Sequence, residues 1–377
     1  MITETRAGSV PRTSSETRKS CFNWLCIVVG NMVALMVNWS DMKIAYITPY
    51  EGEREIVTNL LSDHEVVFHD QLIDKEVPAE LADADAISIF VNSKLTEEMV
   101  DSMPNLKVIA LRSMGYDHVP VAYAQSKGIK VAYVPRYGAQ TVAEHAFTLM
   151  LCLSRKVPEM YELLRRVGNI DIAGHEGFDL CCKTLGVIGT GSIGKRACEI
   201  GRGFRMNVKA YDLYPDEDFA SKYGIEYESF DDVLGSSDII TLHVPATPEN
   251  HHLLNEQSLG KVKAGAYIIN TARGVLIDTV ALLRSLKSGH IAGAGLDVFE
   301  GEEYLKDEMK LLDPEAKIEI DVFRAFAAQH EFLDMSNVIM TPHMAFNTIE
   351  AKLEITETTV KNILTAFDGE PDFPVKL

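Results

Sequence analysis

The stretch TLGVIGTGSIGKRACEIGRGFRMNVKAYD, Thr184 to Asp212, decides the fold of this chain. It begins with an apolar run at 185–188 that predicts a buried strand, and the glycine-rich segment Gly189–Gly194 follows at once. A helical pattern then leads to a second predicted strand at Asn207–Tyr211. Strand, glycine turn, helix and strand in this order are typical of a βαβ unit that binds a dinucleotide.

The three glycines of this motif have separate physical roles. Gly189 allows the tight turn, Gly191 leaves room for a pyrophosphate beside the backbone, and Gly194 lets the helix pack close to the strand. The helix start, with Ser192 and Ile193, then presents free N–H groups and the positive end of its dipole to the phosphates. An ordinary glycine-rich turn is the alternative, because GxGxxG alone is weak evidence.

Asp212 stands at the end of the second strand, where it can discriminate between two cofactors. A carboxylate at this place accepts hydrogen bonds from the adenosine ribose hydroxyls. No Arg follows it directly to receive a ribose phosphate. We therefore predict NAD rather than NADP.

Length, charge and cysteine content limit the possible classes of protein. At 377 residues the chain can hold two globular domains of ordinary size. The formal net charge of −19 argues against a nucleic-acid or anionic-membrane partner. It allows a small anionic substrate, because at short range the attraction of one Arg exceeds the repulsion from the net negative charge of the protein. The six cysteines form no CxxC pair and no His cluster accompanies them, so no metal site is predicted and a reducing, cytoplasmic setting fits best.

The first 41 residues do not match the rest of the chain. Cys21–Val37 is apolar and follows Arg18 and Lys19, which fits a signal peptide or a short membrane anchor. The competing interpretation is that Met42 is the natural start, because the first strand needs nothing before it. We expect the second, with residues 1–41 an extension outside the fold and no membrane partner.

Alternating strand and helix patterns begin at Lys43 and predict a parallel, doubly wound sheet. One of the helical stretches, Thr96–Asp101, has Thr96 as its predicted N-cap. This first unit lacks a phosphate-binding glycine motif, so it is a candidate substrate domain. Its predicted strands are Ile44–Thr48, Val66–Phe68, Ala86–Phe90, Val108–Leu111 and Lys130–Tyr133.

The long helical segment Thr141–Val167 is apolar on more than one face through Leu153, as in helices buried in a core or a subunit interface. Pro158 should kink or break it. Beyond Asp212, strands are predicted at Asp238–Leu242, Ala266–Asn270, Ala292–Leu296 and Val338–Met340, and helices at Phe230–Leu234, Asp278–Lys287, Ala325–Met335 and from Thr348.

Three further motifs follow the glycine turn: Asn270–Gly274 (NTARG), Gly295–Glu302 (GLDVFEGE) and Thr341–His343 (TPH). With these four motifs in order, the chain resembles the D-isomer-specific 2-hydroxyacid dehydrogenases, and most the D-lactate dehydrogenase branch. The resemblance runs from about Met42 to the C-terminus. It implies NAD-dependent interconversion of a small 2-keto acid, pyruvate in the first place, and its D-2-hydroxy acid.

The resemblance also implies an architecture. Two doubly wound α/β domains with parallel sheets are expected, a Rossmann cofactor domain inserted in a flavodoxin-like substrate domain. The substrate domain would comprise 42–140 and 343–377, and the NAD-binding domain 141–342. Family members are usually homodimers, held together by the helix that here matches Thr141–Arg155.

Three residues carry the chemistry that the resemblance implies. Arg273, at the carboxyl end of a strand, would bind the substrate carboxylate in bidentate fashion. His343 would exchange the proton, and Glu302 would stabilise its imidazolium. Judged by residue type alone, Arg273 would be a surface side chain, His343 an ordinary loop histidine and Glu302 part of a charge run. The family motifs favour the catalytic roles instead. Glu300 and Glu303 are expected to be solvated.

The remaining site residues rest on the same resemblance. Their alternative is plain core packing, above all for the aromatic side chains. The expected cofactor contacts are His243, Val244, Pro245, Thr271, Ala272 and Asp297, the last toward the nicotinamide carboxamide. The expected substrate contacts are Met114, Gly115, Tyr137 and Phe346, with Phe90 as a further aromatic wall.

Two alternatives to pyruvate reduction stay open. Within the family, a branched-chain or other D-2-hydroxyacid dehydrogenase has the same motifs. In another class, an NAD-sensing binding protein of the same fold can keep the same catalytic residues, as transcriptional corepressors of this family do. Turnover of NADH with a panel of 2-keto acids distinguishes all three.

Overall fold

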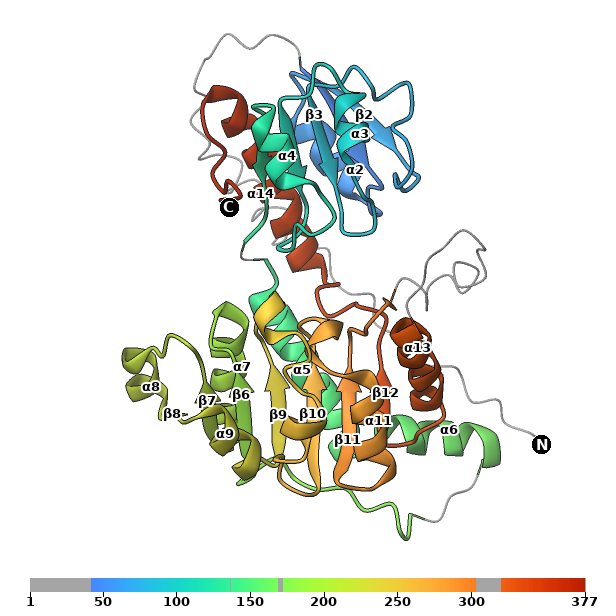
Figure 1. Ribbon diagram of the computed structural model, residues 1–377, viewed down its shortest axis with the longest axis vertical. Coiled ribbons are helices and arrows are strands. Elements are labelled where there is room, and N and C mark those ends of the chain that lie inside the picture. Colours follow the sequence, from blue (N-terminus) through green and yellow to red (C-terminus); the bar gives the residue numbers. More distant parts are fainter. Residues whose placement is uncertain (1–41, 136, 169–171, 303–319, 377) are drawn as a thin grey trace, which may run out of the picture.

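The computed structural model describes residues 42–135, 137–168, 172–302 and 320–376, which form two α/β units, each around its own parallel sheet (Figure 1). The predicted extension 1–41, with its apolar run, lies outside the described residues. In the described part of the chain, no helix has both the length and the apolarity that crossing a bilayer requires.

The first unit holds a five-stranded sheet with the order β2-β1-β3-β4-β5. All its pairings are parallel, and its central strands β3 and β4 are fully buried, as in a sheet that is covered on both faces. The strands are β1 (Lys43–Ile47), β2 (Glu65–His69), β3 (Ala86–Ile89), β4 (Val108–Leu111) and β5 (Lys130–Ala132), and the helices between them are α2 (Glu53–Leu60), α3 (Glu97–Asp101) and α4 (Val121–Ser126).

The C-terminal helix α14 (Ile349–Asp368) returns to this first sheet (Figure 1). Its residues Val360, Ile363 and Ala366 are buried in one cluster with Ile44 and Tyr46 of β1. Thr348 caps the helix by accepting from the N–H of Ala351, as Thr96 does for α3 through the N–H of Met99. Both helix starts, and the helix predicted from Thr348, are confirmed.

The second unit holds a seven-stranded parallel sheet with the order β12-β11-β10-β9-β6-β7-β8. The order reverses at β6, so ligands are expected at the carboxyl ends of β6 and its neighbours. The predicted strands are confirmed with shifts of a residue at some ends, and the short β8 is the one strand among the described residues that was not predicted. The strands are β6 (Thr184–Ile188), β7 (Asn207–Tyr211), β8 (Glu226–Tyr227), β9 (Ile239–Leu242), β10 (Ala266–Asn270), β11 (Ile291–Leu296) and β12 (Val338–Met340).

Helices cover both faces of this second sheet (Figure 1). They are α7 (Ser192–Gly203), α8 (Glu217–Tyr223), α9 (Phe230–Ser236), α10 (Glu256–Leu259), α11 (Thr279–Lys287) and α13 (Ile320–Leu333), with the short turns η1 (Pro248–Asn250) and η2 (Gly274–Leu276). The helix predicted at Ala325–Met335 is confirmed, although α13 begins five residues earlier and ends at Leu333.

The long helical segment is broken, as Pro158 predicts. It forms α5 (Ala139–Ser154), buried against β11 and α7, and α6 (Val157–Val167), with Pro158 in the first turn of α6. Lys156 has a φ of +53° at the break. Helix α6 has no buried residue and extends away from the sheet (Figure 1), with an apolar face exposed to solvent.

Candidate active site

The glycine turn between β6 and α7 has the geometry that a dinucleotide requires. Gly189 has a φ of +92°, and a Cβ there would lie 2.8 Å from the carbonyl oxygen of His243. A Cβ on Gly194 would lie 1.9 Å from the carbonyl oxygen of Gly189, so neither glycine can be replaced without a shift. At Gly191 a Cβ would meet nothing within 4 Å, which leaves the helix start at Ser192 and Ile193 open to a pyrophosphate.

Asp212 is held in place beside this turn. Its Oδ2 accepts from the N–H of Thr190 at 2.6 Å and from the Thr190 hydroxyl at 2.9 Å, and its Oδ1 accepts from the N–H of Tyr214 at 2.9 Å. Burial acts to raise the pKa of Asp212, but these donors outweigh it and the pKa is lowered. The carboxylate is therefore ionised where a ribose would lie.

The segment His243–Val244–Pro245 follows β9 and lies against the same turn. The Val244 side chain comes within 2.7 Å of the point where a Cβ on Gly189 would stand. His243 Nε2 lies 3.0 Å from the Thr241 hydroxyl, and burial lowers the pKa of His243 to about 4. The predicted lining of the cofactor ribose is thus neutral and adjacent to the glycine motif.

Arg273 follows β10 and reaches the loop after β4 in the other unit. Its Nη2 stands 2.9 Å from the position that a Cβ on Gly115 would take. Nη1 donates to the carbonyl of Ala272 at 2.7 Å. The buried Asn270 fixes this loop, because its side chain accepts from the N–H of Ala272 at 3.0 Å and donates to the carbonyl of Arg273 at 2.9 Å. Sequence reasoning gave Asn270 no role, although it opens the NTARG motif.

His343 and Glu302 form a pair in the structure. His343 Nδ1 lies 2.8 Å from Glu302 Oε1, and both side chains are about a quarter exposed. With Nδ1–H donating to the carboxylate, Nε2 is left for proton exchange with a substrate. The backbone of His343 adopts a φ of +52°, which is uncommon for a residue other than glycine.

Asp297 holds the loop that carries His343. Its fully buried carboxylate accepts from the N–H groups of Met344 and Ala345, both at 2.9 Å, and from the Thr341 hydroxyl at 2.5 Å. Burial acts to raise the pKa of Asp297, but the donors, with His145 among them, lower it overall. Both oxygens are thus engaged within the protein, and the expected nicotinamide contact of Asp297 stays a prediction.

The expected substrate residues gather around Phe346. Its ring lies 5.3 Å from that of Phe90 and 6.5 Å from that of Tyr137, between centroids, and Met114 packs on the same cluster. Burial raises the pKa of Tyr137, and the nearby Arg273 acts in the opposite direction. The structure therefore brings the three aromatic side chains together, and one of them, Tyr137, lies near Arg273.

The chain is similar in sequence to proteins of a known family. The family model described as D-isomer specific 2-hydroxyacid dehydrogenase, NAD binding domain, matches residues 147–345. The D-lactate dehydrogenase of Escherichia coli is 39% identical over 308 residues, which are 81% of this chain and 90% of that protein. The chain belongs to the D-isomer specific 2-hydroxyacid dehydrogenase family.

Two further relatives place this dehydrogenase within the family. A 2-hydroxyacid dehydrogenase homolog of Zymomonas mobilis is 38% identical over 310 residues, 81% of this chain and 91% of that protein. The crystal structure of D-lactate dehydrogenase from Aquifex aeolicus, complexed with NAD and lactic acid, has a TM-score of 0.75 at 37% identity, covering 86% of this chain and 95% of that one. This chain is an NAD-dependent dehydrogenase of the D-lactate dehydrogenase-like branch, and it has the two-domain parallel-sheet fold of those structures.

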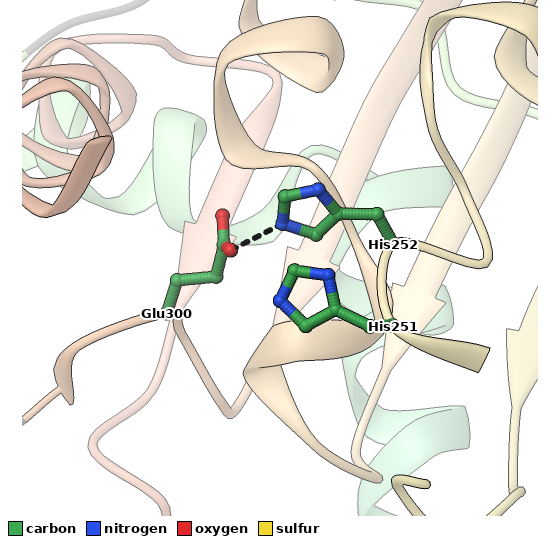
Figure 2. A group of neighbouring side chains, drawn as sticks. All are labelled: His251, His252 and Glu300. Carbon is green, nitrogen blue, oxygen red and sulfur yellow. Dashed lines mark hydrogen bonds and ion pairs between the residues drawn. The ribbon is translucent and has the colours of Figure 1, made fainter. Parts of the chain in front are cut away.

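One expectation about this dehydrogenase was wrong. Glu300, expected to be solvated, has a side chain that is only 17% exposed. Its Oε1 lies 2.6 Å from His252 Nε2 (Figure 2), and its Oε2 accepts from the N–H and the hydroxyl of Thr279. Gly301, with a φ of +62°, turns the chain between Glu300 and Glu302, so the charge run does not stay on one solvated face. Glu303 lies outside the described residues.

A buried ion pair behind the substrate loop was not found by sequence reasoning. Arg112, 1% exposed, donates from Nη1 to Oε2 of the fully buried Glu53 at 2.7 Å. Glu53 Oε1 accepts from the Tyr46 hydroxyl at 2.6 Å and from the Thr356 hydroxyl at 3.0 Å. Arg112 directly precedes the segment that holds Gly115. The sequence offered one signal, an Arg directly after an apolar strand. Its partner Glu53 could not be identified because it lies in α2, 59 residues earlier.

Proposed function

We propose that this dehydrogenase reduces a small 2-keto acid, pyruvate in the first place, to its D-2-hydroxy acid with NADH, and catalyses the reverse reaction. The observation that carries the proposal is the guanidinium of Arg273 against the backbone of Gly115. A cation and a loop from opposite units meet there, which is where a small carboxylate would be enclosed.

In this proposal Arg273 binds the substrate carboxylate with its planar fork, and backbone N–H groups of Met114 and Gly115 complete the anion site. Phe90, Tyr137 and Phe346 surround the substrate side chain. Three large rings leave little room, which favours a methyl group over a branched chain and so supports pyruvate.

When bound, NADH supplies the hydride that reaches the carbonyl carbon. The protonated His343 delivers the accompanying proton from Nε2 to the carbonyl oxygen, and Glu302 stabilises the imidazolium and fixes its orientation. In the reverse direction neutral His343 takes the proton from the hydroxyl group. The cofactor contacts proposed are those at the glycine turn, Asp212, the 243–245 segment and the loop at Thr271 and Ala272.

We further propose residues 42–140 with 343–377 as the substrate domain and 141–342 as the NAD-binding domain. A homodimer is also proposed, but with its contact on α6 rather than on the helix at Thr141–Arg155, because α5 packs against β11 and α7 of its own chain. On the apolar face of α6, the side chains of Val157, Tyr161, Leu164 and Val167 are all more than half exposed. A second copy would bury this face. A cytoplasmic location is supported by the two exposed thiols of Cys181 and Cys182, which suit a reducing compartment.

The test is steady-state oxidation of NADH with a panel of 2-keto acids, from glyoxylate and pyruvate to branched-chain acids. We expect the highest kcat/KM with pyruvate and a chiral product of D configuration. Saturable NADH binding without turnover on any acid would instead support the NAD-sensing alternative. Arg273→Lys keeps the charge but loses the fork, so KM for the keto acid should rise while the NADH affinity stays unchanged.

A further inference from the structure

Three side chains outside the proposed catalytic residues bring metal-binding atoms together. His251 and His252 lie between η1 and α10, and Glu300 follows β11. One donor atom of each lies within 4.8 Å of the other two. Figure 2 shows that both imidazoles present a ring nitrogen to the side on which the Glu300 carboxylate lies.

This donor set is the kind that a transition metal prefers. Two imidazoles and one carboxylate, with water in the open position, form a common four-coordinate Zn²⁺ shell. Imidazole nitrogens favour Zn²⁺, Cu²⁺ and Ni²⁺ over the oxygen-seeking Mg²⁺ and Ca²⁺. The sequence prediction of no metal site rested on the cysteine spacing and on the lack of a His cluster, and it overlooked the adjacent pair His251 and His252.

The carboxylate is already fixed by a second layer of contacts. Glu300 Oε2 accepts from the Thr279 N–H at 3.0 Å and from its hydroxyl at 2.5 Å, which leaves Oε1 directed at His252. Gln329 Nε2 donates to the backbone carbonyl of Glu300 at 2.6 Å. Such outer contacts orient metal ligands and strengthen binding.

The backbone also brings the two imidazoles to one side. Consecutive residues in an extended chain point their side chains to opposite sides. His252 instead adopts a φ of +52°, and the two ring centroids lie 4.0 Å apart with the planes inclined by 32°. A left-handed conformation in a residue other than glycine costs free energy and is concentrated at functional sites.

We propose that His251, His252 and Glu300 bind one divalent transition-metal ion, Zn²⁺ in the first place, and that the bound ion slows the dehydrogenase. Binding replaces the hydrogen bond between His252 and Glu300 by two metal–ligand bonds of about 2.0–2.2 Å. Each neutral ring keeps its one proton on the nitrogen that does not bind the ion, and a ring that was protonated releases one proton to solvent. His251 supplies the third ligand and water the fourth.

The effect on turnover follows from the sequence around Glu300. Only Gly301 separates it from Glu302, whose carboxylate lies 2.8 Å from His343. The donor atoms lie within 4.8 Å of one another and must come closer together around one ion. This pull acts on Glu300 against its contacts with Thr279 and Gln329, strains the backbone that carries Glu302, and so weakens the orientation of His343. This second part rests on the proposed function, whereas metal binding itself does not.

The experiment titrates chelator-treated, full-length protein with ZnCl₂ by calorimetry and follows NADH oxidation in parallel. We expect one Zn²⁺ per chain, reversible loss of turnover, and recovery with EDTA. His251→Ala should weaken binding roughly tenfold or more and remove the inhibition, with unchanged turnover in EDTA. His251→Tyr serves as a second variant should the first fold poorly. Co²⁺ in place of Zn²⁺ should give the visible absorption of a tetrahedral site in the wild type and not in His251→Ala.

His69→Gln is the matched control, since His69 faces one carboxylate, that of Glu80 at 3.4 Å, in the first unit. It should bind Zn²⁺ as the wild type does. Zinc binding that survives in His251→Ala, or no binding by the wild type, overturns the site. Binding at this site without any change in turnover overturns the regulatory part alone. If no keto acid is turned over, calorimetry still decides whether the site exists.

Discussion

The glycine turn with Asp212, called the cofactor edge below, comes from one short stretch of chain. The proposed substrate edge, which is the loop at Gly115 with the ion pair behind it, is assembled from segments far apart. Thr190 and Asp212, which shape the cofactor edge, are 22 residues apart. Behind the substrate loop, Arg112 pairs with Glu53 across 59 residues, and Thr356 reaches the same carboxylate across 303. The two edges therefore depend on different kinds of interaction.

The cofactor edge relies on backbone N–H groups and on missing side chains, as at Gly191 and Gly194. The substrate edge relies on a charge pair removed from water, with Arg112 also 4.5 Å above the ring of Tyr46. A buried pair adds little net stability over apolar side chains, but removing one partner is expensive. We therefore expect single substitutions at the substrate edge to reduce the free energy of unfolding more than those at the cofactor edge.

Arg112→Met should have the largest effect. It leaves the carboxylate of Glu53 buried without its cation, which we expect to reduce the free energy of unfolding by about 3–5 kcal/mol. The loop at Gly115 loses its support, so KM for the keto acid should also rise. Urea unfolding and steady-state kinetics measure both effects.

The double variant Arg112→Met with Glu53→Gln is the control for that substitution. It removes the unpaired charge, so most of the lost stability should return, while the keto-acid KM stays high. A single Arg112→Met variant with wild-type stability would show that the substrate edge does not depend on this ion pair.

The two edges also differ in how far the sequence predicts them. Gly189, Gly194 and Asp212 follow one another closely, and the roles predicted for the glycines match the space around each one. The strands and most helices were likewise predictable from local apolar patterns. Glu53 was not, because its partners Arg112 and Thr356 meet it only in the folded chain.

Glu300 shows the same limit within the catalytic turn. Its sequence neighbours Glu302 and Glu303 suggest a solvated charge run, but His252 and Thr279 enclose it. Those contacts come from a loop and a helix start that are adjacent only in space. Pairing of His343 with Glu302 was predicted, since family motifs record such long-range contacts and local patterns do not.

Asp297→Asn tests the carboxylate that holds the loop of His343, between the cofactor edge and the substrate edge. The amide loses one charged acceptor for the N–H groups of Met344 and Ala345, a cost of about 2–3 kcal/mol. The pKa of Asp297 is lowered in the folded state, so its carboxylate contributes stability above its unfolded pKa of about 4 and loses it as the pH falls through the folded value.

The stability difference between wild type and Asp297→Asn should therefore be constant from about pH 5 to pH 8 and shrink below about pH 4. Unfolding with urea across this range measures it. A difference that grows toward low pH would contradict the assigned sign and point to another group.

Gly191→Ala and Gly194→Ala distinguish two effects at the cofactor edge. The first Cβ takes up space that the ligand would occupy, and the second overlaps the protein backbone. At Gly194 the new Cβ overlaps the carbonyl oxygen of Gly189, so we expect about 1–3 kcal/mol loss of stability together with weak NADH binding. At Gly191 the Cβ meets open space and the φ of −64° suits alanine, so stability should be unchanged while NADH binding weakens. Equal NADH affinity in wild type and Gly191→Ala would mean that the pyrophosphate does not lie there.

The smallest effect is expected at Asp212. Its lowered pKa keeps the carboxylate ionised at neutral pH, where it repels the ribose phosphate of NADPH. Asp212→Asn removes this charge and retains an acceptor for the N–H of Thr190. The ratio of kcat/KM for NADH over NADPH should fall roughly tenfold, about 1.4 kcal/mol. Since Asp212 is partly exposed, added salt should lower the wild-type preference for NADH over NADPH. The preference of the Asp212→Asn variant should hardly change with salt. Equal use of both cofactors by the wild type would show that the cofactor edge does not discriminate by charge.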